Sequence, residues 1–412
     1  MQTFTYLFLV FLFASTLVQL YLSLRQKQHV AAHRAAVPAA FADKVTLAEH
    51  QKAADYTLAK GGFGRIEVVL GLVILLGWTL AGGLAWLDSV WRSLGWSDLY
   101  TGTAVIVSLL LISSVLDLPA SLYRSFVLEQ RFGFNKMTPL TFASDLLKST
   151  ALSLVIGVPF VMLILWLMGF AGAYWWLYAW AALTAFSLLM TWAYPKFIAP
   201  LFNKFNPLEE GEVATRIDAL LTRAGFNSNG VFVMDGSRRS AHGNAYFTGF
   251  GKNKRIVFFD TLLKHLTPAQ VEAVLAHELG HFKRKHIVKG MVLSMSMTLA
   301  GFAVLAWLMQ QAWFYAAFGV QDSTYMALLL FLLVSPAFTF FIGPLMAWWS
   351  RKHEFEADAF AAEQSSSAEL IAALVGLYKE NASTLTPDPW YSAFYDSHPP
   401  AAIRIAHLQQ QP

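Results

Sequence analysis

Residues 149–194 read STALSLVIGVPFVMLILWLMGFAGAYWWLYAWAALTAFSLLMTWAY, an uncharged run of 46 residues. A helix needs roughly 20 apolar residues to cross the hydrocarbon core of a bilayer, so this run is long enough for two crossings. Gly169, Ala171 and Gly172 lie near its middle and permit a tight reversal of the chain. We therefore predict two membrane-spanning helices joined by a short turn.

Five further uncharged runs predict five more spans, over residues 1–24, 68–87, 99–116, 290–321 and 323–350. The first is expected to be a retained helix, because it lacks the basic leading region of a signal peptide and its apolar stretch is too long. The overall composition agrees, with 56% hydrophobic and 14% charged residues. The predicted fold class is an all-α polytopic membrane protein with seven transmembrane helices.

Positive charge is distributed unevenly around these spans. All but one of the 30 Lys and Arg residues fall on one side, and Arg92 is the exception. The positive-inside rule makes the basic side cytoplasmic, with the N-terminus outside and the C-terminus inside. The net charge of +4 is ordinary for cytoplasmic loops, so no nucleic-acid partner is expected.

The pentad HELGH at residues 277–281 lies in the polar segment between spans five and six. Histidines four residues apart share one helical face, so His277 and His281 can hold one zinc ion. Glu278 would then sit beside the open coordination position and act as general base on an activated water. The preceding residues 267–270, TPAQ, supply an N-cap, a proline at the first helical position and a capping-box partner. A helix is therefore predicted here.

A catalytic zinc site needs a third protein ligand, and the chain has no cysteine to supply it. We assign Glu354 as that ligand. Asp358 lies four residues on, on the same helical face, and would accept the free N–H of a ligating histidine. Taken alone, the segment fits a solvated amphipathic helix just beneath the membrane better than a ligand site. Together with HELGH it predicts one Zn²⁺ per chain.

His398 and Arg404 form a second pair of candidates near the end of the chain. Hydrolysis of a peptide bond requires a donor that stabilises the oxyanion of the tetrahedral intermediate. His398, made rigid by the prolines that follow it, could supply that donor. Both residues fit the surface of a C-terminal tail equally well. His286 and His353 are interpreted as interfacial residues, and His242 is only a weak candidate for the site.

Four segments are expected along the chain. Residues 1–195 carry five transmembrane helices with cytoplasmic loops, and residues 290–350 carry the last two. Between them, residues 196–289 form a small cytoplasmic α/β metallopeptidase segment, with a helix over 208–225 and strands at 230–234, 245–250 and 255–259. Residues 351–412 form a cytoplasmic C-terminal segment that carries the third ligand.

The chain resembles the type I CAAX prenyl proteases, integral-membrane zinc metallopeptidases that remove the C-terminal tripeptide from prenylated proteins. Besides HELGH, the resemblance lies in the motifs GFNK (133–136), PLFNKF (200–205), NAYF (244–247), KRIVFFDTLL (254–263), EFEAD (354–358) and HP (398–399).

This resemblance implies a seven-helix barrel that encloses an intramembrane chamber, with zinc at its cytoplasmic end. It implies Glu354 as third ligand and a place at the site for His398 and Arg404. Asn244 and Ala245 match the family's edge strand, which pairs with the substrate backbone. The expected partners are a peptide or lipidated peptide and the lipid bilayer. Short loops point to a compact bacterial member of an inner membrane; a eukaryotic member would lie in the endoplasmic reticulum membrane.

Two other functions stay open at this point. A membrane-protein quality-control metalloprotease would use the same chemistry without a prenyl group, although such enzymes usually have fewer spans. A transporter would place ionisable residues inside several spans. The predicted spans have almost none, and Asp117 at a span end is the exception.

Overall fold

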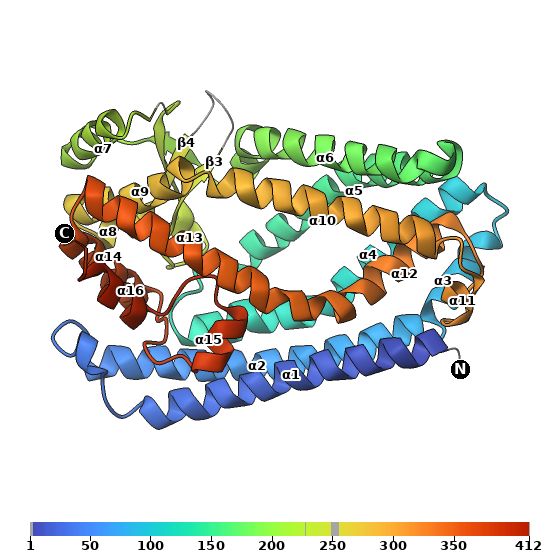
Figure 1. The fold of residues 1–412 in the computed structure, drawn as a ribbon, viewed down its shortest axis with the longest axis horizontal. Helices are drawn as coiled ribbons and strands as arrows, with labels where there is room; N and C mark the ends of the chain where they lie inside the picture. Colours follow the sequence, from blue (N-terminus) through green and yellow to red (C-terminus); the bar gives the residue numbers. More distant parts are fainter. Residues whose placement is uncertain (1–2, 227, 249–254, 412) are drawn as a thin grey trace.

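Seven helices of the computed structural model are long and apolar enough to cross a membrane, which confirms the predicted number. The structure describes residues 3–226, 228–248 and 255–411. The seven spans are formed by α1 Thr3–His33, α2 Leu47–Thr79, α4 Asp98–Tyr123 with its continuation to Glu129, α5 Pro139–Phe170, α6 Trp175–Ala193, α10 His286–Leu308, and α12 Thr324–Thr339 with α13 Gly343–Gln364. The fold is that of a polytopic, mainly α-helical membrane protein (Figure 1).

Several helices extend well beyond the uncharged runs that predicted them. The side chain of Thr46 caps the start of α2 and forms a capping box with Glu49. Consequently most of the basic residues expected in the first loop lie on α1 and α2, and only residues 34–46 join the two. The predicted span over 68–87 ends early, at Thr79, because Gly82 adopts a left-handed conformation (φ 83°) and begins α3 Gly83–Arg92. The span over 290–321 likewise ends at Leu308, before the short helix α11 Ala312–Ala316.

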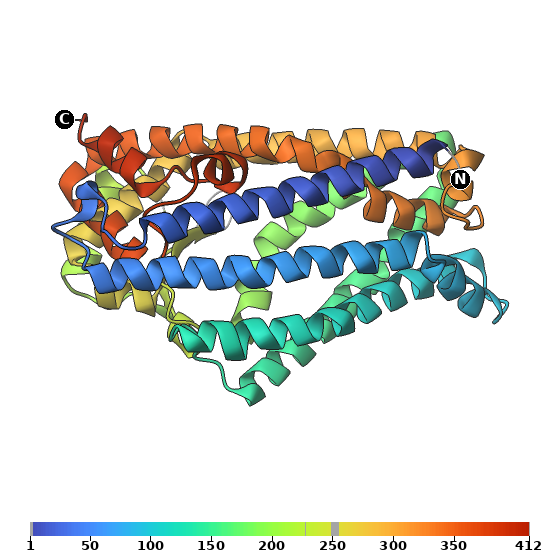
Figure 2. The ribbon, with the colours of Figure 1, turned by 90° about the horizontal axis from the view of Figure 1, so that it is seen from below.

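The long helices form a closed ring. Successive neighbours α1–α2, α4–α5, α5–α6, α6–α10, α10–α12 and α12–α1 pack against one another, and α3 joins α2 to α4. Figures 1 and 2 show these helices lying lengthwise, with the N-terminus, α3 and α11 at one end. A hydrophobic core that includes Phe8, Leu84, Phe314 and Tyr325 fills the ring at that end. The ring is therefore closed by packed side chains at the end opposite the HELGH helix.

The other end of the ring carries a small sheet and its helices. The strands are β1 Phe205–Pro207, β2 Val231–Met234, β3 Ala245–Thr248 and β4 Arg255–Phe259, in the order β1-β2-β4-β3. β2 and β4 are parallel, whereas β3 is antiparallel to β4 and forms one edge of the described sheet. Positions 249 and 250 of the predicted second strand lie outside the described residues. The predicted α/β unit is thus present.

Among the described residues, five shorter helices complete a second hydrophobic core with this sheet: α7 Glu212–Arg223, α8 Asp260–His265, α9 Pro268–Lys283, α14 Ser367–Glu380 and α16 Ala401–Leu408. A further short helix, α15 Pro389–Tyr395, packs against α1 and α13. The core includes Leu220 of α7, Phe258 of β4, Leu275 of α9 and Leu408 of α16, which are all fully buried or nearly so. Since α9 packs against α13 and α14, and α16 against α13 and α14, the chain's last residues lie beside the HELGH helix.

Candidate metal centre

The HELGH pentad lies in the second half of α9, where the two histidines project from one face. The side chain of Thr267 accepts a hydrogen bond from the Gln270 backbone, and the Gln270 side chain accepts one from the Thr267 backbone. This is the capping box expected from the sequence. Gly280 lets α13 come close, because a Cβ placed there would lie 2.9 Å from the Cα of Ala357. The glycine inside the pentad therefore permits the contact that brings Glu354 to the histidines.

Three donor groups converge at this contact. The Nε2 atoms of His277 and His281 are 3.2 Å apart. Each lies close to the Glu354 carboxylate, at 3.4 Å for His277 and 3.3 Å for His281. A tetrahedral zinc ion with bonds of about 2.1 Å holds its ligand atoms about 3.4 Å apart. The three residues therefore fit zinc with one coordination position left open.

The burial of this group also favours a bound cation. Glu354 is 3% exposed and His277 6% exposed, and Oε2 of Glu354 has no hydrogen-bond partner among the described residues. The Arg404 guanidinium lies 3.7 Å from that oxygen, so a metal ion bound between the two imidazoles and the carboxylate would be the closer positive charge. A zinc ion at this point would satisfy all three groups.

Asp358 and Arg404 lie directly behind His277. Oδ1 of Asp358 is 2.8 Å from Nδ1 of His277, and the guanidinium of Arg404 donates to both carboxylate oxygens of Asp358 at 2.9 and 2.5 Å. Asp358 is fully buried and Arg404 is 5% exposed. Arg404 Nη2 also lies 3.3 Å from this nitrogen, but the shorter contact is to the Asp358 carboxylate, which can only accept, so the His277 Nδ1 is assigned the proton. That tautomer leaves the His277 Nε2 lone pair free for a metal.

Glu278 lies on the wall of a cavity of about 530 Å³ that also touches His277, His398 and Arg404. The carboxylate of Glu278 forms no hydrogen bond or ion pair with any of the described residues. Burial raises the pKa of this carboxyl above its usual range, since desolvation disfavours the charged form. A carboxylate in this state binds a proton more readily than one in water.

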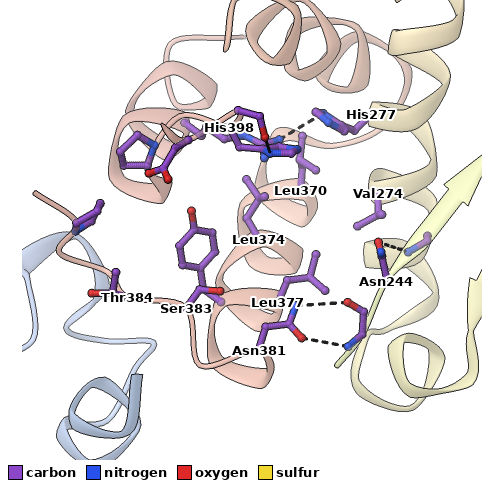
Figure 3. Close-up of a pocket in the computed structure, with 18 of the residues that line it drawn as sticks. Asn244, Val274, His277, Leu370, Leu374, Leu377, Asn381, Ser383, Thr384 and His398 are labelled. Carbon is purple, nitrogen blue, oxygen red and sulfur yellow. Dashed lines mark hydrogen bonds between the residues drawn. The ribbon is translucent and has the colours of Figure 1, made fainter. Parts of the chain in front are cut away.

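The remaining predicted residues line the same cavity from two separate parts of the chain (Figure 3). His398 precedes α16, and its Nε2 lies 3.4 Å from Glu354 Oε1 while 60% of its side chain stays exposed. Asn244 and Ala245 lie where β3 begins, at the open edge of the sheet. By contrast, His242 does not join the metal group; its ring stacks on Phe134 with centroids 4.2 Å apart.

One part of the site was not recognised in the sequence. His286, interpreted above as interfacial, is 6% exposed, and its Nδ1 lies 3.0 Å from Nδ1 of His281. Its Nε2 lies 2.9 Å from Oε2 of Glu356, and its ring stacks on that of His353 at 3.9 Å. The only signal available was the position of His286 five residues after His281. Lys285, with φ 58°, ends one helix and begins the next, so helical spacing does not place His286 beside His281.

Two histidines and a carboxylate around an open position, beside a glutamate and at one end of a ring of seven membrane helices, define an integral-membrane zinc metallopeptidase. Comparison with known proteins places the chain within this class. Residues 26–204 match the family model of the CAAX prenyl protease N-terminal region with five membrane helices, and residues 207–411 match that of peptidase family M48. The chain belongs to the M48 family of CAAX prenyl protease type.

Individual relatives agree over most of their length. The CAAX prenyl protease 1 homolog of Oryza sativa subsp. japonica is 39% identical over 308 residues, which cover 74% of this chain and 72% of that protein. The CAAX prenyl protease 1 of Saccharomyces cerevisiae is 38% identical, covering 72% and 69% respectively. The crystal structure of S. mikatae Ste24p matches with a TM-score of 0.91 and 32% identity over 99% of both chains. The resemblance inferred from the sequence motifs is thereby confirmed.

Proposed function

We propose that this zinc endopeptidase hydrolyses a peptide bond near the C-terminus of prenylated CAAX proteins. The observation that carries the proposal is the tetrahedral spacing of His277, His281 and Glu354 beside the unpartnered carboxylate of Glu278, on the wall of one cavity. The relatives named CAAX prenyl protease support the substrate class. The proposed site would face the cytoplasm, since nearly all Lys and Arg residues lie on that side of the spans.

Bound zinc would supply a Lewis acid that polarises the scissile carbonyl and makes a water more acidic. Glu278 then accepts the proton of the attacking water and passes it to the departing amine. His398, exposed in the cavity beside the metal group, donates a hydrogen bond to the oxygen on which negative charge develops. The open edge of β3 at Asn244 and Ala245 pairs with the peptide backbone of the substrate.

Two chains of hydrogen bonds hold the histidine ligands in the tautomer that metal binding requires. Asp358, which Arg404 holds in place, accepts a hydrogen bond from the Nδ1–H of His277. For His281 the consistent arrangement is Nδ1–H donating to His286 Nδ1, with the Nε2–H of His286 donating to Glu356. Each chain of hydrogen bonds thus runs from a histidine ligand to a carboxylate. In both ligands the Nε2 lone pair is left free for the metal.

Replacing His286 with alanine is expected to weaken zinc binding by about 10- to 100-fold, because the His281 ring loses the partner that fixes its tautomer and orientation. Zinc affinity measured by competition with a chelator checks this. His265→Ala is the matched control, since His265 is an exposed histidine on α8, outside the metal group. Unchanged zinc affinity in His286→Ala would remove His286 from the site.

The prenyl requirement is tested with two peptides of identical sequence, one farnesylated on the CAAX cysteine and one unmodified. Detergent-solubilised enzyme is expected to cleave the farnesylated peptide with the higher kcat/KM, because the apolar chain binds inside the ring of membrane helices. Equal rates for the two peptides would instead favour a quality-control protease. That alternative uses the same zinc chemistry but needs no lipid on its substrate.

A further inference from the structure

A second cavity, of about 910 Å³, adjoins the one at the metal centre and lies against α1 and α2. The two cavities share part of their walls, so a chain that leaves one can enter the other without crossing a packed layer. The shared residues are Gln26, Gly243, Asn244, Asn381, Ser383 and Tyr395. Asn244 immediately precedes β3, so the start of the proposed edge for the substrate backbone borders both cavities.

Among the described residues that line the second cavity, two are positively charged and none is acidic. Lys60 and Arg65 of α2 line it. Arg65 donates to the hydroxyl of Ser23 at 3.2 Å, and the Lys60 ammonium lies 4.8 Å from the ring centroid of Tyr56. Within the described part of the chain, neither cation forms an ion pair with a carboxylate. No carboxylate of the described residues therefore balances these two positive charges.

Arg65 lies well inside α2, where a charge without a partner is unusual. Arg65 lies 14 residues before Thr79, the last residue of α2, which is roughly 21 Å along the helix. The hydrocarbon core of a bilayer is about 30 Å thick, so a core measured from Thr79 along the helix would extend past Arg65. Charged residues there are costly and mark functional positions. The helix surface beside Arg65 is open, because a Cβ added at Gly64 would meet no atom within 4 Å.

We propose that Arg65 and Lys60 bind the free C-terminal carboxylate of the peptide substrate. This inference rests on the proposed function. A CAAX peptide ends in a carboxylate three residues beyond the cleaved bond, a span of about 10 Å in extended form. The planar guanidinium of Arg65 matches a carboxylate with two parallel hydrogen bonds, and Lys60 adds a second positive charge. Recognition of the terminal carboxylate restricts cleavage to peptide bonds close to the C-terminus of the substrate.

The test compares farnesylated peptides that differ only in a C-terminal carboxylate or carboxamide, using the full-length, zinc-loaded enzyme. The wild type is expected to cleave the acid with a kcat/KM about 10- to 100-fold above that of the amide. Arg65→Gln should remove most of this preference by slowing cleavage of the acid, and leave cleavage of the amide unchanged. Arg65→Lys, which keeps the charge, should restore part of the preference.

Lys52→Gln is the matched control, since Lys52 is a cation on the same helix that does not line the cavity. It should keep the full preference for the acid. If the wild-type enzyme cleaves the acid and the amide at equal rates, the proposed carboxylate site is wrong. This holds also if the two cations bind the phosphate of an anionic lipid instead. Equal loss of both activities in Arg65→Gln assigns the residue a structural role and also overturns it. A wild-type enzyme that cleaves neither peptide refutes the proposed function itself.

Discussion

Glu278→Gln is expected to lower kcat for peptide cleavage by about 100- to 10,000-fold while the enzyme keeps its zinc. Glutamine has nearly the shape of glutamate but cannot accept a proton from the attacking water. Glu278 is not one of the three residues whose donor atoms converge at the metal position, so the variant keeps all three ligands. Steady-state kinetics on a farnesylated peptide, together with the zinc content of the same preparation, measures both quantities.

Glu272→Gln is the control for this change. Glu272 lies on the same helix, α9, and pairs with Arg216 and Arg223 away from the metal group. Its loss should leave kcat within a factor of about two, because such partly exposed ion pairs contribute little. A Glu278→Gln enzyme that still cleaves at more than about a tenth of the wild-type rate would show that another group accepts the proton.

Glu354→Ala is expected to weaken zinc binding by about 100-fold or more and to abolish cleavage. Removing one of three protein ligands forfeits a large share of the binding free energy of a zinc site. It also leaves the histidine pair without the carboxylate that offsets the charge of the metal. Zinc affinity follows from chelator competition. Thermal unfolding gives a second measurement, since added zinc stabilises only a protein that binds it.

The controls for Glu354→Ala lie on the same helix, α13. Glu363 is an exposed carboxylate of that helix, so Glu363→Ala should retain wild-type zinc affinity. Glu356→Ala should have an intermediate effect, because Glu356 reaches the metal group only through His286. A larger loss in Glu356→Ala than in Glu354→Ala would reverse our assignment of the third ligand.

Much of the site could be predicted because its chemistry is encoded in short motifs. The capping residues Thr267 and Gln270 and the four-residue spacing of His277 and His281 depend only on helical geometry, and the structure has this helix. Glu354 required a further argument, based on the absence of cysteine and the need for a third ligand. The structure brings its carboxylate to within 3.4 Å of both imidazoles.

Other features could not be predicted from local patterns. His286 follows a left-handed residue, so its side chain is directed by a change in chain direction and not by helical periodicity. The sequence predicts Lys60 and Arg65 to lie in a cytoplasmic loop, because each predicted span is limited to an uncharged run. In the structure α2 continues through both residues, and the adjoining cavity accommodates their polar groups.

The sequence by itself determined that this chain crosses the membrane seven times and that one helix carries a histidine pair suited to zinc. Both depend on interactions between residues close in the chain, namely the length of an apolar run and the pitch of a helix. The tertiary structure alone decided which distant residues complete the site. Glu354 lies more than seventy residues after His281, and only the close packing of α9 on α13 at Gly280 brings them together. Such contacts depend on the packing of side chains across the whole fold, which no local pattern specifies.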